Sequence, residues 1–334
     1  MALTYTSLDT TKLSTAEVYA KRLCELAEDN PRIVALTADL AKSTKIGFFG
    51  QKFPERLYNV GIAEQNMMGV AAGMAKAGLI PFTCTFAIFN SCRALDQVHT
   101  DICYQNLNVK MLGTHAGTSF GQAGSTHHST EDLAIMRSMA NLTVVCPADG
   151  METANVVAAA VEHEGPMYIR INRGFDQVVY DKADYGFELG KAVQLHEGSD
   201  ACIIACGSAV FQALQAAREL EASDQVHVRV LDMHTLKPLD KEAVLKAVHD
   251  TRRIITAEDA TVIGGLGGAV AECIAESGMG CAFRRLGVQD RFSPIGYHED
   301  LMSFHGIDEN GIATAIRDLL KLDFEADDDW SDEV

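Results

Sequence analysis

The sequence lacks the features that mark membrane and secreted proteins. No run of apolar residues approaches the roughly 20 that a membrane-spanning helix needs, and the first residues, MALTYTSLDTTKLS, contain no apolar signal core. Nine cysteines occur without a Cys-x-x-Cys pair, and most of them stand in apolar runs. Such cysteines are typical of small buried side chains in a reducing compartment. The sequence therefore predicts a cytoplasmic protein.

Basic residues are scarce. There are 28 Lys and Arg against 46 Asp and Glu, which gives a net charge of -18. Binding to a phosphodiester backbone requires clustered cations, so this balance excludes a nucleic-acid partner, and it also disfavours docking on an anionic membrane. Part of the acidity lies in residues 322–334, which hold seven acidic residues and no basic ones. This tail has too little apolar surface to pack, and we predict that it is disordered.

Short apolar runs alternate along the chain with longer amphipathic segments. This alternation is typical of a parallel sheet covered by helices, and 334 residues are enough for two domains. In the first half the pattern predicts a helix that begins after Ser14 and further helices at 64–77, 91–104, 130–139 and 150–162. The predicted strands are 32–37, 56–59, 80–85, 109–112, 143–146 and 167–171.

A second alternating set begins near residue 200. It predicts strands at 201–205, 227–232, 253–257 and 283–286, and helices at 210–220, 241–249, 266–276 and 312–320. The stretch between the two sets is polar and poorly periodic. We therefore predict an α/β fold with a doubly wound domain over residues 1–180, a linker over 181–196 and a smaller α/β domain over 197–321.

Five side chains of four chemical kinds follow the predicted strands of the first domain. In chain order they are Asp39, Glu64, Phe86, His115 and Arg173. Ligands of an open parallel sheet bind beyond the carboxyl ends of its strands. An edge that gathers two acids, an aromatic ring, an imidazole and a guanidinium is a predicted ligand site.

The segment Gly61-Ile-Ala-Glu64 resembles the G-I-x-E segment in the pyrimidine-binding domain of transketolase-type enzymes, which use thiamine diphosphate. The resemblance implies that Glu64 is catalytic: it hydrogen-bonds the aminopyrimidine ring nitrogen, which promotes formation of the cofactor's reactive carbanion. It also places Asp39 close to the cofactor. Without the resemblance, a Glu near a helix start would be interpreted as a capping residue.

The segment Thr85-Phe86-Ala-Ile-Phe89 resembles the family segment whose aromatic residues pack on the aminopyrimidine. The resemblance implies that Phe86 and Phe89 bind the cofactor by stacking. Cys92 stands where the family has a third aromatic residue. The alternative is that both phenylalanines are ordinary core residues.

A glycine-rich loop over residues 113–128 resembles a transketolase loop with two histidines at the separation of His115 and His127. The resemblance implies that both contact sugar hydroxyls and assist proton transfer, a role suited to imidazoles that titrate near neutral pH. A three-histidine zinc site is the rival chemistry, disfavoured because no acidic or Cys ligand stands at a suitable spacing. The G-x-S-x-G pattern around Ser119 lacks the strand-to-helix context of a nucleophile.

Two further segments resemble family segments that bind the substrate phosphate. They contain Ser43 and Arg173, and a guanidinium suits an oxyanion because it can donate two parallel hydrogen bonds. Arg170, just before, is either functional or a structural ion-pair partner. Where the family has a second phosphate-binding Arg, this chain offers only Lys12 nearby.

The Gly-Asp-Gly segment that holds Mg²⁺ and the diphosphate in the family is absent, although the resemblance covers residues from about Leu13 to Leu320. It implies that a separate amino-terminal subunit supplies this motif and that this chain holds no metal. The predicted protein is the carboxy-terminal subunit of a two-chain transketolase, an α2β2 heterotetramer. With thiamine diphosphate and Mg²⁺, it would transfer a two-carbon ketol unit from a ketose phosphate to an aldose phosphate.

Three alternatives stay open. They are the β subunit of a 2-oxo-acid dehydrogenase, a synthase of the deoxyxylulose phosphate type, and a degenerate regulatory subunit. The two histidines of the loop favour a sugar substrate. Ala123 stands where the family loop has an Asp that contacts a donor hydroxyl, and the chain lacks the second phosphate-binding Arg. Both departures predict a specialised donor, such as a branched sugar phosphate or a ketose with another terminal anion.

Overall fold

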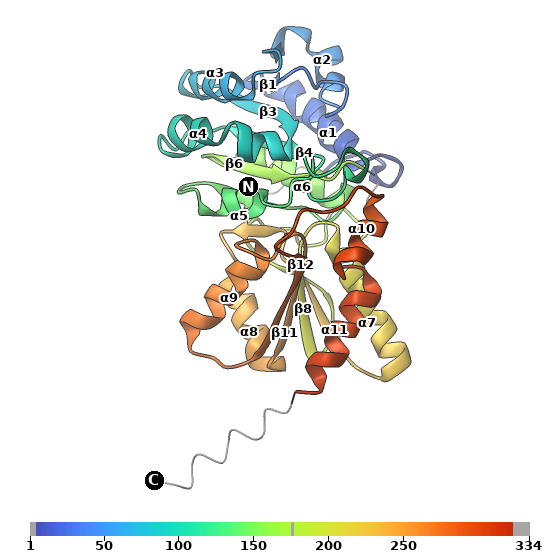
Figure 1. Ribbon diagram of the computed structural model, residues 1–334. Helices are drawn as coiled ribbons and strands as arrows, with labels where there is room; N and C mark the ends of the chain where they lie inside the picture. Colours follow the sequence, from blue (N-terminus) through green and yellow to red (C-terminus); the bar gives the residue numbers. More distant parts are fainter. Residues whose placement is uncertain (1–4, 175–176, 323–334) are drawn as a thin grey trace.

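Two sheets, each covered by helices on both faces, lie one after the other along the molecule (Figure 1). The structure is a computed structural model that describes residues 5–174 and 177–322. The first sheet has the strand order β10-β5-β6-β4-β3-β1-β2, and the second has the order β12-β11-β8-β9-β7. Each sheet is parallel apart from one antiparallel edge strand, β10 in the first and β7 in the second. The two-domain α/β fold is confirmed.

The first sheet is a parallel core that buries both of its faces. Its strands are β1 (Ile33–Thr37), β2 (Leu57–Asn59), β3 (Ile80–Phe86), β4 (Lys110–Thr114), β5 (Thr143–Val145), β6 (Met167–Arg170) and β10 (Thr235–Lys237). Successive residues of a strand point to opposite faces. Thus Leu112 packs with α1 (Thr15–Asp29), α2 (Gly47–Lys52) and α6 (Gly150–Glu162). Its neighbour Met111 packs with α3 (Glu64–Lys76) and α5 (Asp132–Ser138) on the other face.

The second sheet is built in the same way. Its strands are β7 (Val193–His196), β8 (Ala201–Ala205), β9 (Val228–Asp232), β11 (Arg253–Thr261) and β12 (Ala282–Val288). Ile203 faces α7 (Ala209–Asp224) and α11 (Glu309–Leu320). Ile204 faces α8 (Lys241–Thr251) and α9 (Leu266–Ser277). The short helix α10 (His298–His305) lies beside the junction of the two domains (Figure 1).

Four elements differ from the sequence predictions. The predicted helix 91–104 is two π-helical turns, Phe89–Arg93 and Val98–Cys103, separated by the single turn α4 (Leu95–Gln97). Strand β7 lies inside the predicted linker and pairs with β9. Strand β10 comes from the second half of the chain and pairs with β5 of the first sheet. Helix α10 was not predicted, and the predicted disordered tail lies outside the described residues from position 323 onward.

The described helices include none that is both long enough and apolar enough to cross a bilayer.

Candidate active site

The carboxyl ends of β1, β3, β4 and β6 meet at one edge of the first sheet. Asp39, two residues after β1, accepts a hydrogen bond from Asn59 Nδ2 at 3.1 Å, and its own N–H donates to Asn59 Oδ1 at 3.0 Å. Asp39 and His115 both have positive φ, at 60° and 58°. Non-glycine residues in this region are strained, and they concentrate at functional sites. Ser43 is exposed in the loop that carries Asp39, and within the described residues it has no side-chain hydrogen bond.

A cluster of aromatic and imidazole rings occupies this edge. Phe86, at the end of β3, lies 4.1 Å from the His115 ring and 5.6 Å from the Phe89 ring, measured between centroids. His127 lies 5.6 Å from Phe89 and 6.3 Å from Phe86. The structure thus brings together four of the residues singled out from the sequence. Phe120, which the sequence analysis missed, joins the cluster at 4.9 Å from His115 and 5.8 Å from His127.

His115 is held in its neutral form. Burial is the main cause, and the charges of Arg173, His127 and Lys45 add to it, so that the pKa of His115 falls to about 3. Its Nδ1 atom lies 3.0 Å from Thr114 Oγ1. In this chain, His115 therefore does not titrate near neutral pH, in contrast to the expectation from the sequence. It can accept or donate a hydrogen bond, and its uncharged ring can pack against another aromatic ring.

Glu64 is the first residue of α3, and its side chain is only 1% exposed. Arg93 Nη1 donates to both carboxylate oxygens of Glu64, at 3.1 and 3.0 Å. The Arg93 guanidinium in turn lies over the Phe89 ring, 4.0 Å from its centroid. The start of α3 has no side-chain cap, so Glu64 pairs with Arg93 rather than capping the helix. Arg93 was missed from the sequence because its segment had been predicted to be a regular helix.

Arg173 lies next to the ring cluster. Its guanidinium is 4.9 Å from the Phe120 ring, and its backbone N–H donates to Ser119 Oγ at 3.2 Å. The side chain is exposed and lines a cavity of about 190 Å³. The lining residues are Ser119, Gly121, Gln122, Asn172, Arg173, Gly174, Gly296, Tyr297, His298 and Glu299.

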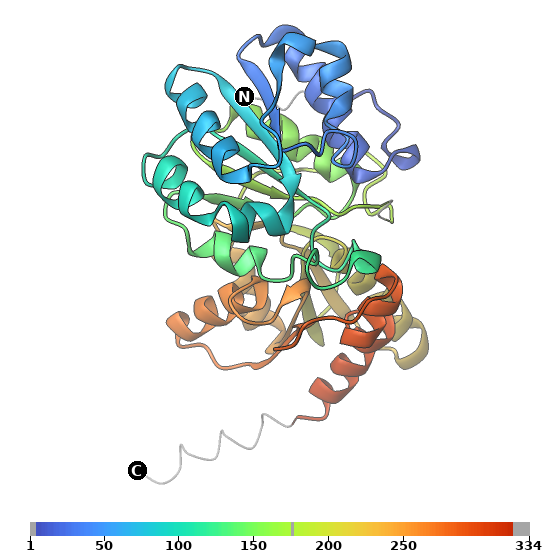
Figure 2. The ribbon, with the colours of Figure 1, turned by 45° about the horizontal axis from the view of Figure 1, so that its top comes forward.

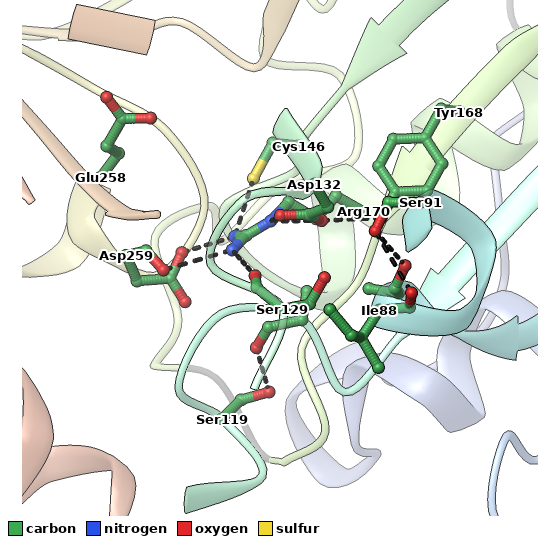
Figure 3. A network of polar contacts seen from close by, with 12 residues as sticks. Ile88, Ser91, Ser119, Ser129, Asp132, Cys146, Tyr168, Arg170, Glu258 and Asp259 are labelled. Carbon is green, nitrogen blue, oxygen red and sulfur yellow. Dashed lines mark hydrogen bonds and ion pairs between the residues drawn. The ribbon is translucent and has the colours of Figure 1, made fainter. Parts of the chain in front are cut away.

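Arg170 has a structural environment. Its guanidinium is fully buried between Asp132, which accepts from Nε at 3.0 Å, and Asp259 of the second domain (Figure 3). Tyr168 donates to the same Asp132 carboxylate at 2.7 Å. Of the two interpretations left open by the sequence, the structure favours the ion pair. This network joins the two domains directly beneath the histidine loop, where Ser129 O accepts from Arg170.

No group of three or more His, Cys, Asp or Glu side chains that could hold a metal ion occurs among residues 5–174 and 177–322. His128 Nε2 lies instead 3.1 Å from Gly121 O, inside the loop. The described residues therefore do not assemble the rival three-histidine zinc site.

Comparison with protein families gives two matches. Residues 11–175 match the family described as transketolase, pyrimidine binding domain, and residues 190–312 match the transketolase C-terminal domain. Among curated relatives, the 6-deoxy-6-sulfo-D-fructose transketolase subunit SqwH of Clostridium sp. is 42% identical over 91% of this chain and 93% of its own length. One of the subunits of the apulose-4-phosphate transketolase of Phocaeicola vulgatus is 37% identical over 91% of this chain and 96% of its own length.

A solved structure has the same architecture over nearly its whole length. It is described as a split gene transketolase, inactive beta4 tetramer, and it is 42% identical in sequence. It covers 93% of this chain and 99% of its own, with a TM-score of 0.84.

Proposed function

Because this chain belongs to the transketolase family through both of its domains, as the carboxy-terminal subunit of a split enzyme, we propose that it contributes half of a thiamine-diphosphate site. The observation that carries the proposal is that a buried carboxylate, Glu64, is linked through Arg93 to Phe89 of the ring cluster, which stacks on Phe86. The enzyme would transfer a two-carbon ketol unit between a ketose phosphate and an aldose phosphate.

The residues of the cluster suit an aminopyrimidine ring in their chemistry. Phe86 and Phe89 offer aromatic packing, and Glu64 offers a carboxylate in a water-poor position. Asp39 would lie near the same cofactor from the neighbouring strand end. Thiamine diphosphate, when bound, supplies the nucleophilic carbon that attacks the donor ketose. The role proposed for Glu64 is to hold a proton on the ring nitrogen, and the two hydrogen bonds from Arg93 orient its carboxyl group until then.

The sugar would lie against the imidazoles. A neutral His115 can accept a hydrogen bond from a sugar hydroxyl, and its contact with Phe86 fixes its plane. His127 is less buried and would exchange protons with the donor or acceptor hydroxyls. Ser43 and Arg173 would bind the anionic end of the substrate, since both are exposed on the same edge.

The remaining parts of the site would come from a second polypeptide. That partner would carry the Gly-Asp-Gly motif, bind Mg²⁺ and the diphosphate, and assemble with this chain as an α2β2 heterotetramer in the cytoplasm. The split-gene structure described as an inactive β4 tetramer supports this assignment, because a similar chain assembled with itself is inactive.

The donor would be a specialised ketose. Ala123, in the turn Gly121–Ala123, places a methyl group where the family has a carboxylate for the donor. Two relatives are named for donors outside the common pentose and hexose phosphates, one with a sulfo group and one called apulose-4-phosphate. Replacing Ala123 by Asp should shift kcat/KM toward the common donors. Unchanged kcat/KM ratios, with common donors already preferred by the wild type, would contradict this assignment.

Reconstitution tests the proposed function. This chain alone should show no ketol transfer and bind thiamine diphosphate weakly, and addition of the amino-terminal subunit with Mg²⁺ should produce activity. Ketol transfer should be compared with decarboxylation of 2-oxo acids, which would indicate the dehydrogenase alternative. Strong transfer by this chain alone would exclude the divided site, and an inactive complex on every sugar donor would favour a regulatory subunit.

A further inference from the structure

The cavity beside Arg173 has walls from both domains. One wall comes from the first domain and includes Arg173, Ser119 and Gln122. The other wall comes from the second domain, at the start of helix α10, and includes Tyr297 and His298. None of the site residues predicted from the sequence belongs to the second domain, so this second wall is unassigned.

The cavity begins one side chain away from the imidazoles. Phe120 contacts both His115 and His127, and the Arg173 guanidinium lies 4.9 Å from the same Phe120 ring. Arg173 is also close enough to His115 to help lower its pKa. A sugar whose reacting end lies at the imidazoles would therefore extend past Phe120 toward this cavity.

The second-domain wall is held firmly against the histidine loop. Gly121 packs so closely on Gly296 that a Cβ at position 121 would lie 2.2 Å from the Gly296 carbonyl oxygen. The Gly296 N–H donates to Gly121 O at 3.4 Å, and Ser125 Oγ donates to Ser293 O at 2.7 Å. Figure 2 shows this contact, with the red C-terminal segment meeting the green loop. The wall thus packs directly on the loop that carries His127.

The groups on the two walls suit an oxyanion. Arg173 provides an exposed guanidinium, and Tyr297 provides a hydroxyl on a side chain that is 64% exposed. His298 Nδ1 lies 3.1 Å from Thr118 Oγ1, and within the described residues no hydrogen bond engages its Nε2. The N-terminus of α10 adds a positive partial charge, which Glu299 and Asp300 in its first turn partly offset. Glu299 also lines the cavity, and its carboxylate limits the negative charge that the cavity accepts.

We propose that Tyr297 and His298 determine donor specificity, by forming with Arg173 the subsite for the oxyanion at the end of the sugar remote from its carbonyl. This inference rests on the proposed function and adds the second domain to the substrate site. The ligand class is a ketose with a terminal sulfonate or phosphate. The restraint imposed by Glu299 favours an end group of low charge.

The test uses the complex of both subunits and two donors, a ketose with a terminal phosphate and the uncharged four-carbon ketose erythrulose. His298→Ala and Tyr297→Phe should each raise KM for the phosphorylated donor about tenfold, the size of one lost hydrogen bond to a charged group. Both should leave kcat and KM for erythrulose nearly unchanged. Glu299→Gln should lower KM for the phosphorylated donor only.

His249→Ala is the matched control, because this histidine is exposed on α8 in the second domain, away from the cavity. An equal rise in KM, or an equal fall in kcat, with both donors would overturn the proposal. It would indicate that the wall only supports the loop. Unchanged kinetics with both donors would also overturn it. Tyr297→Phe keeps the test decisive if His298→Ala fails to fold, since Tyr297 is exposed. A wild-type complex inactive even with erythrulose would instead contradict the proposed function.

Discussion

At the scale of single residues, the pairing of Glu64 with Arg93 shows how a buried charge is kept available. A carboxylate that is 1% exposed would be costly without a partner. Arg93 provides that partner from a side chain that is 46% exposed and stacked on Phe89. An exposed partner can move without disturbing the core. Under the proposed function, Glu64 would exchange Arg93 for the cofactor's ring nitrogen at a small cost in packing.

Glu64→Gln is expected to lower kcat of the reconstituted enzyme by roughly 10²–10⁴-fold, the usual contribution of a general acid–base group. The amide keeps the size of the side chain but cannot hold the negative charge. Circular dichroism and sedimentation should show unchanged folding and assembly. Retention of most of the activity would mean that Glu64 serves only the ion pair with Arg93.

His115→Ala and His127→Ala are expected to reduce ketol transfer more than they reduce affinity for thiamine diphosphate. Their rings contact Phe86 and Phe89, and under the proposed function they face the sugar, so their loss would remove contacts with the sugar rather than with the cofactor. Steady-state kinetics and calorimetric titration of the cofactor would separate the two effects. Equal losses in rate and in cofactor affinity would identify the loop as structural.

At the scale of helices and strands, the Arg170 network determines how the histidine loop is held. Arg170 at the end of β6 pairs with Asp132 of α5 and with Asp259 of β11. Gly117 of the loop lies against Asp259, since a Cβ there would come within 2.1 Å of Asp259 Oδ2. The loop therefore rests on an ion-paired layer shared by both sheets.

Arg170→Met is expected to destabilise the protein by about 3–5 kcal/mol, because it leaves two buried carboxylates without a cation. Urea unfolding measures the change. Arg317→Met is the matched control, since Arg317 makes two ion pairs on an exposed surface, where each pair contributes at most about 1 kcal/mol. If the two variants lost similar amounts of unfolding free energy, burial would add nothing to the stability that the Arg170 network provides.

The sequence predicted most strands and helices within a few residues, because apolar runs between amphipathic helices are typical of this fold. It missed elements that depend on distant contacts. Strand β10 is three residues long and forms by pairing with β5, which is about 90 residues earlier in the chain. The π-helical turns break the regular 3.6-residue period that predicted a single helix over 91–104.

The residues of the candidate site also divide into those with a local sequence signal and those placed by distant contacts. Glu64, Phe86, His115 and Arg173 follow strands, so topology alone placed them at one edge. Phe120, Arg93 and Tyr297 carry no local signal, because their positions are set by packing between segments far apart in the chain. Phe120 meets the histidines, and Tyr297 meets the cavity beside Arg173, only once the loop and the second domain have packed together.

At the scale of the whole molecule, a second acidic cluster lies where the two domains meet. Asp232 at the end of β9 and Glu152 of α6 are fully buried neighbours. Burial is the main cause that raises the pKa of Asp232 to about 7, and it raises the pKa of Glu152 as well. Tyr180 and Tyr185, from the segment between the domains, donate to these carboxyl groups at 2.7 and 3.0 Å.

Stability of the junction should decline as pH rises. The folded protein retains a proton on Asp232 up to about pH 7, whereas an unfolded Asp loses it near pH 4. The contribution of the protonated Asp232 to the free energy of unfolding is therefore full below about pH 4 and is lost as the pH rises through 7. Asp232→Asn cannot ionise and can still accept from Tyr180, so it should raise the melting temperature more at pH 8 than at pH 5.

Asp250→Asn is the control for that measurement, since surface cations lower the pKa of Asp250, the opposite direction. The Asp250→Asn variant should not raise the melting temperature at pH 8. An equal rise in melting temperature for Asp232→Asn at both pH values would contradict the retention of a proton by Asp232 up to about pH 7.

Strand β10 makes the first sheet depend on a segment from the second half of the chain. It leaves the second half of the chain to complete the first sheet, and Cys146 N–H donates to His234 O beside it at 2.7 Å. A coding sequence divided between α6 and β8 would yield a first product whose β5 edge exposes unpaired backbone groups, a surface that favours aggregation. Recombination can therefore shuffle this chain as a whole more readily than it can exchange one of its domains.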